Sequence, residues 1–427
     1  GPPLDRRGAR GRMRLGTYLR SLRPGLTRPV WTLEGAVLVN SVGTGMVLPF
    51  VMIYLHNVRG IGLATAGLIV ATFAGVSFVI TPVAGWVVDA RGPRTTLAAS
   101  LVIMALGYAM FPLVREAWQA FALMAVAGIG NGGFWPSQSS LLAGLTTRET
   151  RSTAYAVQRA VFNLGIGVGA LVGGLVATSS EPGTFTVLFL IDAGTFVAYA
   201  ATLAVVPAPR AAEATPEGPS VGYRDVLRDG VLLRVVGLNV VFVTAGFAQL
   251  EATFPVFARN EVGVSERVIG LVFLVNVLVI LVAQLPVVRL LEGRSRMAAL
   301  AAMGVLWAAS WTTVLAAELW FEAIAAAVVL VVAGMIFAVG ECVLGPAQSA
   351  LVADLAPEGL RGRYIALLTN SYAVGFIVGP AVGGALLAAS PSGLWAGAAV
   401  VLLAAAGVAL VMNRRVPVDV RLVPSRV

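Results

Sequence analysis

Long apolar runs alternate with short polar segments along the whole chain. A run of about 20 apolar residues is long enough to cross the hydrocarbon core of a bilayer as a helix. Twelve such runs lie at residues 30–55, 62–87, 95–113, 119–145, 154–178, 184–207, 234–258, 267–289, 297–316, 321–350, 364–388 and 393–412. This pattern predicts an all-α integral membrane protein with twelve transmembrane helices in two pseudo-symmetric six-helix bundles.

A polar segment rich in proline and acidic residues separates the two groups of six runs. It is too polar to span a membrane and too short to form a domain, so we expect a linker. The expected parts are a tail at 1–29, a bundle at 30–207, the linker at 208–233, a bundle at 234–413 and a tail at 414–427. Gly1 and Pro2 are interpreted as a remnant of tag removal, and no signal peptide is expected.

Part of the chain repeats at an offset of 210 residues, with 14 identities in 39 gapless positions between residues 136–174 and residues 346–384. Each copy holds two apolar runs joined by a short loop, which carries Arg151 in one copy and Arg361 in the other. The repeat unit is therefore a pair of membrane helices. A duplicated membrane bundle with a site between its halves is typical of secondary transporters.

The composition agrees with this interpretation and excludes a soluble protein. Apolar residues make up 58% of the chain and charged residues 12%, and the mean hydropathy is +0.87. The basic pI of about 10.5 does not indicate a nucleic-acid partner, because 25 of the 30 arginines lie in the tails, the linker and the loops on one side of the predicted bundle. By the positive-inside rule, both termini and the linker of this multi-pass protein are expected to be cytoplasmic.

The loop between the second and third runs contains Gly85, Asp89, Arg91, Gly92 and Arg94. This spacing resembles the signature loop of the major facilitator superfamily, although Ala90 and Pro93 stand where that family has basic residues. The resemblance implies a twelve-helix fold and a switch role for the loop. A helix N-terminus favours a carboxylate, and the resemblance implies that Asp89 contacts the start of the eleventh helix when the cytoplasmic side is closed.

Glycines recur every four residues in the fifth and eleventh runs, which puts small residues on one helix face and lets two backbones approach closely. The pattern of the fifth run resembles the antiporter motif of drug exporters in the same superfamily, with Ala170 in place of its proline. This exporter resemblance implies the bacterial plasma membrane. A further exporter signature, an arginine in the fourth helix, is replaced by Met124. We expect a sliding seam between the halves, with plain close contact as the alternative, at Gly165, Gly169, Gly173, Gly174, Gly375, Gly379, Pro380, Gly383 and Gly384.

Charged residues inside the runs are the candidates for function, because a charge at mid-membrane costs roughly 2.5–3.5 kcal/mol. Glu251 and Glu341 lie in the seventh and tenth runs, which the resemblance places around the cavity, and are the first candidates for proton coupling. Glu34 and Asp192 are the next candidates, with interfacial hydration and a structural hydrogen bond as their alternatives. Arg159 could form an ion pair with Glu341 across the two halves.

Amide and aromatic residues in the runs expected around the cavity suit an amphipathic organic molecule better than a phosphate or a dicarboxylate. The candidates for substrate contact are Asn40, Trp135, Gln138, Phe247, Gln249, Phe254, Asn276, Gln284, Gln348, Asn370 and Tyr372. Taken singly, each aromatic side chain could equally be part of the protein core.

No pattern indicates catalysis, a metal site or a cofactor. Gly128-Ile-Gly130-Asn-Gly-Gly133 matches a dinucleotide fingerprint only formally, because it lies within an apolar run. We therefore expect a monomeric transporter that exports amphipathic organic compounds in exchange for protons by alternating access. The alternatives are an exporter of an endogenous lipid, siderophore or metabolite, an uncoupled facilitator and, from another class, a receptor or scaffold.

Overall fold

The computed structural model describes residues 25–207, 226–357 and 360–424. Eleven of its helical segments are long and apolar enough to cross a membrane, so the chain is an all-α multi-pass membrane protein. Helix α6 (Ala117–Leu145) has 29 residues but is not among the eleven, because its glycine, serine and amide residues lower its hydropathy. The expected count of twelve membrane helices therefore stays a prediction.

The first group of helices, here called the N-half, precedes residue 207. It consists of α2 (Arg28–Val47), η1 (Leu48–Phe50), α3 (Val51–Ile53), η2 (Tyr54–Val58), α4 (Leu63–Arg91), α5 (Pro93–Met110), η3 (Phe111–Leu113), α6, α7 (Arg148–Val176) and α8 (Pro182–Thr202). The segments from α2 to η2 form one continuous rod of 31 residues. Most of the expected tail at 1–29 lies outside the described residues.

The second group, the C-half, follows residue 226. It consists of α10 (Gly230–Phe242), η4 (Val243–Phe247), α11 (Ala248–Glu251), α12 (Thr253–Asn260), α13 (Glu266–Leu291), α14 (Arg296–Trp320), α15 (Ala323–Glu341), η5 (Leu344–Ser349), α16 (Ala350–Leu355), α17 (Arg361–Ala389) and α18 (Pro391–Met412), with short turns η6 (Asn413–Arg415) and η7 (Val418–Val420) after it. Residues 208–225 of the expected linker lie outside the described residues.

Two helices begin earlier than the apolar pattern predicts, because polar residues cap them. Asp229 accepts hydrogen bonds from the backbone N–H groups of Val231 and Leu232, at 2.9 and 3.0 Å, so α10 begins at Gly230 and not at 234. Thr147 and Thr150 form a capping box that starts α7 at Arg148, six residues before the apolar run. A helix begins where its first N–H groups find partners, and hydropathy does not report this.

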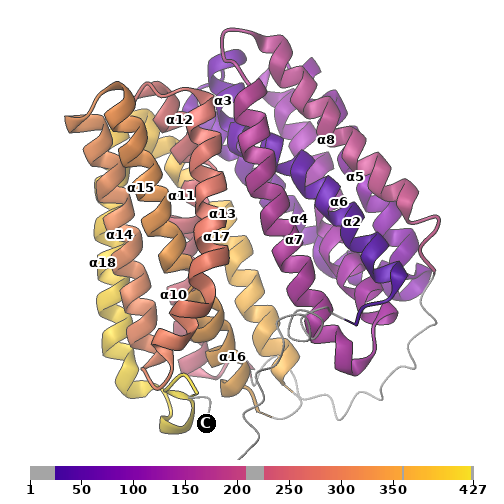
Figure 1. The fold of residues 1–427 in the computed structure, drawn as a ribbon, viewed down its shortest axis with the longest axis vertical. Helices are drawn as coiled ribbons and strands as arrows, with labels where there is room; N and C mark the ends of the chain where they lie inside the picture. The colour runs from indigo at the N-terminus through magenta and orange to yellow at the C-terminus, as the bar shows by residue number, and fades with distance from the viewer. Residues whose placement is uncertain (1–24, 208–225, 358–359, 425–427) are drawn as a thin grey trace, which may run out of the picture.

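The two halves lie side by side, the N-half in indigo to magenta and the C-half in red to yellow (Figure 1). Helix α4 of the N-half contacts α17 of the C-half, and α7 contacts α13. The described chain begins and ends at the same end of the molecule. We call this the basic end, since it carries Arg91, Arg294 and Arg361, and we call the other the distal end, where α3 and α12 meet.

The arginines of the internal repeat perform the same structural task in both halves. Arg151 donates a hydrogen bond to the carbonyl oxygen of Ala143 at 3.2 Å, and Arg361 donates to that of Ala353 at 3.1 Å. Both carbonyl groups belong to the last turn of a helix, where backbone acceptors lack a helical donor and positive charge is favoured. This cap explains why the short loop keeps an arginine in both copies.

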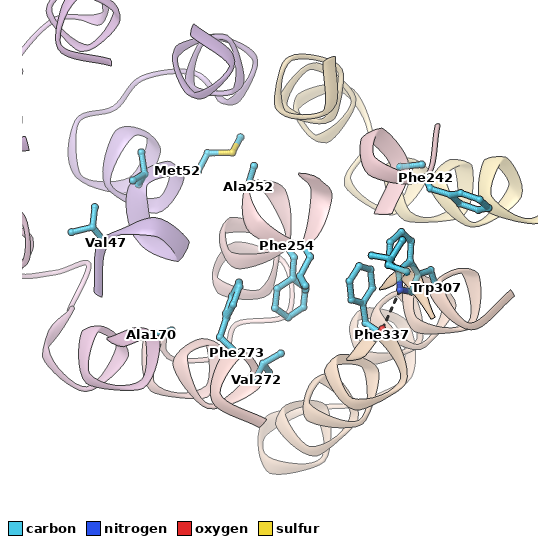
Figure 2. Packing of buried hydrophobic residues seen from close by; sticks show 14 of the residues in the cluster. Val47, Met52, Ala170, Phe242, Ala252, Phe254, Val272, Phe273, Trp307 and Phe337 are labelled. Carbon is cyan, nitrogen blue, oxygen red and sulfur yellow. Dashed lines mark hydrogen bonds between the residues drawn. The ribbon is translucent and has the colours of Figure 1, made fainter. Parts of the chain in front are cut away.

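An aromatic cluster forms the core of the C-half (Figure 2). The rings of Trp307 and Phe337 stack at 4.5 Å with an angle of 2° between their planes. The indole N–H of Trp307 donates to the carbonyl oxygen of Phe337 at 3.1 Å, which satisfies its only polar group in a fully buried place. This contact fixes α14 against α15.

The chain after α18 returns to the hairpin between α13 and α14. Ser295 and Leu422 form an isolated antiparallel bridge, and the N–H of Gly293 donates to the carbonyl oxygen of Val423 at 2.9 Å. The N–H of Val423 donates in turn to the carbonyl oxygen of Arg294 at 2.9 Å. Residues 413–424 therefore form a strap, the C-terminal strap, across the loop of the C-half that corresponds to residues 85–94 of the N-half.

The glycine faces of α7 and α17 lie mainly inside each half, which corrects the expected seam between the halves. A Cβ atom on Gly165, Gly169 or Gly173 would collide with α2. By the same test, Gly375, Gly379 and Gly383 lie against η4 and α11. Only Gly174, Gly384 and the carbonyl of Pro380 approach the other half. Most of the motif therefore holds each bundle together.

Replacing Gly169 with alanine should destabilise the N-half. The added Cβ would overlap the carbonyl oxygen of Val42, and such overpacking costs about 1–3 kcal/mol. Thermal unfolding of the purified protein should show a lower midpoint. The matched control is Gly194→Ala, since no atom lies within 4 Å of a Cβ there; equal midpoints for the two variants would contradict the assigned role.

Candidate functional site

A cavity of about 480 Å³ lies between the two halves. Its wall is mainly apolar and aromatic and contains Met52, Phe73, Met104, Tyr108, Phe134, Trp135, Phe162, Phe196, Phe247, Phe273 and Phe376. The amides of Asn40, Asn131, Asn163 and Asn276 add hydrogen-bonding groups. Within the described residues, the charged side chains of the wall are the carboxylates Glu251 and Glu341. A wall of this kind matches a large apolar ligand that carries few polar groups.

Both carboxylates lie where a membrane helix breaks. Glu251 is the last residue of α11, and Pro255 follows four residues later, so the Glu251 carbonyl cannot receive a helical hydrogen bond. Glu341 is the last residue of α15, and Pro346 frees the Cys342 carbonyl next to it. The side chain of Gln284 donates to that carbonyl at 3.1 Å. Each break thus leaves a backbone carbonyl group beside the carboxylate without its helical hydrogen bond.

Three of the rods that approach the cavity also contain a π-helical segment, η2, η4 and η5. The first lies in the rod of α2, the second precedes Glu251 and the third follows Glu341. Segments of this kind are rare and occur mostly at functional sites. The sequence pattern did not indicate η2 and η4, because neither contains a proline, whereas η5 contains Pro346.

Glu251 and Glu341 lie close enough to interact electrostatically. The charge of Arg159 acts on Glu341 and on the hydroxyl group of Tyr372. The described residues include no ion pair between Arg159 and Glu341, since the two charged pairs within 4.0 Å are Arg259 with Glu266 and Arg296 with Asp354. The expected direct ion pair is therefore replaced by attraction at longer range.

Four of the expected contact residues, Asn40, Trp135, Phe247 and Asn276, line the cavity. The other expected contact residues lie outside its wall, and most of them use their side chains in contacts within the protein. Gln249 donates to the carbonyl oxygens of Thr244 and Gly379, both at 2.9 Å. Gln348 bonds to Asn239 and Tyr372, and Phe254 packs on Phe273 and Trp395. Gln138 is buried, Gln284 caps Cys342, and Asn370 is exposed outside the cavity.

The distal end is closed by contacts between the halves. Asn57 and Asn260 exchange side-chain hydrogen bonds of 2.6 and 3.3 Å, and the N–H of Ser179 donates to the carboxylate of Glu266 at 3.0 Å. The side chain of Arg259 donates to the same carboxylate at 3.1 Å. In the part of the chain that the structure describes, all the hydrogen bonds between the halves lie at this end.

Backbones meet directly beside these hydrogen bonds. A Cβ on Gly384 would collide with the Leu63 carbonyl and Gly67, and a Cβ on Gly174 would collide with the Glu266 carbonyl and Gly270. Gly174 and Gly384 are equivalent positions of the 210-residue repeat. Two backbone contacts therefore close the distal end, one between Gly67 and Gly384 and one between Gly174 and Gly270. We call these two contacts together the distal gate.

A family comparison agrees with this architecture. The sequence profile described as "Major Facilitator Superfamily" matches residues 34–265 and 237–426, which is most of the chain. The chain belongs to the Major Facilitator Superfamily. The resemblance inferred from the loop at residues 85–94 is thus confirmed.

Relatives of this chain include the uncharacterised MFS-type transporter YqjV of Bacillus subtilis, which is 25% identical over 83% of this chain and 85% of its own length. Multidrug resistance protein 1 of the same organism is 22% identical over 81% of this chain and 86% of its own length. Among solved structures, a variant of the nucleoside transporter NupG superposes with a TM-score of 0.76 at 12% identity, covering 90% of this chain and 99% of that one. The structural likeness shows the fold.

The superfamily loop lies at the basic end. Gly92 has φ of 84°, which favours glycine and makes the tight turn between α4 and α5. Arg94 donates to the carbonyl oxygen of Ala204 at 3.1 Å, and Arg91 is exposed. Asp89 is exposed and makes no hydrogen bond or ion pair with any described residue. The expected contact with the start of α17 is thus not made in this distal-closed conformation.

Alanine at Gly174 or Gly384 should open the distal gate of this superfamily member. The new methyl group overlaps backbone atoms of the other half only while the gate is closed, and at about 1–3 kcal/mol it should shift the open-to-closed ratio by about tenfold. Spin labels on the loops after Val58 and Asn260 measure the distance. Gly194→Ala is the control, and an unchanged distance distribution in both gate variants would refute the prediction.

Substituting Asp89 with asparagine should raise the population of the distal-closed conformation. The rise is expected because the proposed contact of Asp89 with the start of α17 exists only in the other conformation, and removing a contact made in one state shifts the equilibrium away from that state. Spin-label distances between α4 and α17 at the basic end would report the shift. Identical distributions for Asp89→Asn and the native protein would argue against this contact.

Proposed function

We propose that the protein is a secondary active transporter that exports amphipathic organic compounds in exchange for protons by alternating access. The observation that carries this proposal is the apolar cavity between two repeated halves, with two carboxylates in its wall and a gate made of separable contacts at one end. The excess of arginine supports a cytoplasmic basic end. The distal-closed conformation is then the inward-facing one, in the plasma membrane, with a monomer as the working unit.

The wall favours a substrate with a positive charge. Aromatic faces attract cations, and the attraction grows when water is excluded. Glu251 and Glu341 add negative charge, and the described residues of the wall include no arginine. Similarity to a multidrug resistance protein supports the same class of substrate. A phosphate or dicarboxylate would meet two carboxylates of its own sign.

Glu251 and Glu341 are the proposed proton carriers. A carboxylate in a poorly hydrated cavity favours its protonated form, and an arriving cation favours the anion, so substrate and proton displace one another. One proton moved through 100 mV supplies about 2.3 kcal/mol, enough for a roughly 50-fold substrate gradient. Proton exchange at these two side chains would therefore be sufficient to drive export.

Glu251→Gln and Glu341→Gln test the proposal in proteoliposomes with an imposed proton gradient. Neutralising the true carrier should abolish uphill transport of a lipophilic cation, while binding and downhill exchange persist. Glu261→Gln, at an exposed position of the distal end, is the control and should transport normally. If gradient-driven transport survives in both single variants and in the double variant, neither residue is the carrier, and Glu34 or Asp192 is the next candidate.

A thermal-shift screen of diverse amphipathic compounds at two pH values would separate the remaining alternatives. Stabilisation that depends on pH supports proton exchange, whereas equal stabilisation at both values favours an uncoupled facilitator. Binding confined to lipids, siderophores or metabolites would redirect the substrate class. Binding without any transport in proteoliposomes would favour a receptor or scaffold.

A further inference from the structure

Asp192 in α8 is a carboxyl group buried in the N-half without a counter-charge. Its side chain is 0% exposed. One carboxyl oxygen, Oδ1, accepts a long hydrogen bond of 3.4 Å from the hydroxyl of Thr44. The other oxygen, Oδ2, has no hydrogen-bond partner in the described part of the chain. A purely structural aspartate would be expected to use both oxygens, because an unsatisfied buried polar atom costs free energy.

The elements around Asp192 supply polar but uncharged groups. Helix α2 contributes Asn40, Thr44 and the backbone at Gly43, and α8 contributes Thr195, which accepts a hydrogen bond of 3.3 Å from Asn40. Tyr108 of α5 is a titratable neighbour on which the charge of Asp192 acts. No arginine of α7, which also touches α8, contributes to this environment, and η3 has no titratable residue.

Glu34 and Tyr199 lie nearer the basic end, and in the described part of the chain neither the carboxylate of Glu34 nor the hydroxyl of Tyr199 has a hydrogen-bond partner. Tyr199 lies seven residues after Asp192 on the same helix, about 10.5 Å along its axis. The charge of Glu34 acts on Tyr199, and Glu34 does not line the cavity. Tyr199 is therefore too far from Asp192 to share a hydrogen with it, and Asp192 is a buried carboxyl group of the N-half behind the cavity wall.

An unpaired carboxylate at this depth would carry a large desolvation cost, which a neutral acid avoids. Space also favours a proton over a larger cation, because a methyl group on Gly43 would already lie 2.9 Å from Oδ1. We infer that Asp192 is a second proton-binding site, which holds a proton in the distal-closed conformation and releases it when a cationic substrate binds against Asn40 and Thr44. This inference rests on the proposed function.

The release has a short path. Asn40, Thr44 and Tyr108 all line the cavity, so one layer of side chains separates Asp192 from its interior. When a cation binds against that layer, the O–H bond of the Asp192 carboxyl group breaks, and the proton passes to cavity water and then to the solution. The anion that remains is stabilised by the bound cation. The N-half then contributes one proton to each cycle, in addition to the proton carried by the C-half.

The first experiment measures the protonation of Asp192 without any substrate. The chain has seven aspartates, so carboxyl-13C-aspartate labelling allows infrared or NMR detection of a protonated side chain at neutral pH. The native protein should show one such signal, and Asp192→Asn should lack it. Ionised aspartates throughout the labelled native protein would overturn the inference, and this measurement does not depend on whether the variant folds.

The second experiment counts the protons released when tetraphenylphosphonium binds to the purified protein, with a pH-sensitive dye. The native protein should release about one proton more than Asp192→Asn, and the Glu251→Gln, Glu341→Gln double variant should still release the proton of Asp192. Glu261→Gln is the control and should match the native count. An equal count in Asp192→Asn and the native protein would overturn the inference.

The two experiments separate this inference from the proposed function. If tetraphenylphosphonium does not bind the native protein, the proposed substrate class fails, and the labelled aspartate signal alone decides whether Asp192 holds a proton. If the probe binds and protons are released only from Glu251 and Glu341, the proposed function is supported, and Asp192 is not a second proton-binding site. Sodium ions that replace protons in the count would also contradict a proton site.

Discussion

In a bilayer, every backbone N–H and C=O group must find a partner inside the protein, and the functional features of this chain lie where that requirement is hardest to meet. Pro255 and Pro346 each free a carbonyl group in the middle of the membrane. One of these carbonyls is satisfied by a side chain from another helix, Gln284 of α13. Glu251 and Glu341 lie directly beside these two breaks. Each of these carboxylates thus lies beside a helix break at the cavity wall.

The contacts that close the distal end use the same backbone. At the pairs Gly67–Gly384 and Gly174–Gly270, the absence of a side chain lets two helices approach until their main chains touch. Such contacts depend on shape and contribute few strong bonds that must be broken. Of the polar contacts beside them, Asn57 with Asn260 is exposed, where water can replace it, whereas Glu266, which accepts from Ser179, is buried. A closed state of this kind can open at moderate cost.

The apolar pattern predicted the fold well because lipid selects long runs of apolar residues, and the repeat predicted the two halves because the helix-capping arginines and the glycines recur in both. The cavity was harder to predict. Glu251 and Glu341 could be found, since a charged residue in an apolar run is conspicuous. Gln249 and Gln348 resemble ligand contacts in the sequence, but their side-chain amides form hydrogen bonds within the protein. The glycine motif predicted close approach of helices correctly. It did not predict that most of this contact lies within each half, because glycine spacing defines a helix face and does not say which helix covers that face.

The C-terminal strap ties together three helices of the C-half at the basic end. In the C-half, residues 413–424 bind the hairpin between α13 and α14 through backbone hydrogen bonds, so that α13, α14 and α18 are tied together at the basic end. In the corresponding hairpin of the N-half, Arg94 donates a hydrogen bond to the carbonyl oxygen of Ala204. Because of the strap, the hairpin between α13 and α14 and the end of α18 are expected to move as one body at the basic end of the C-half.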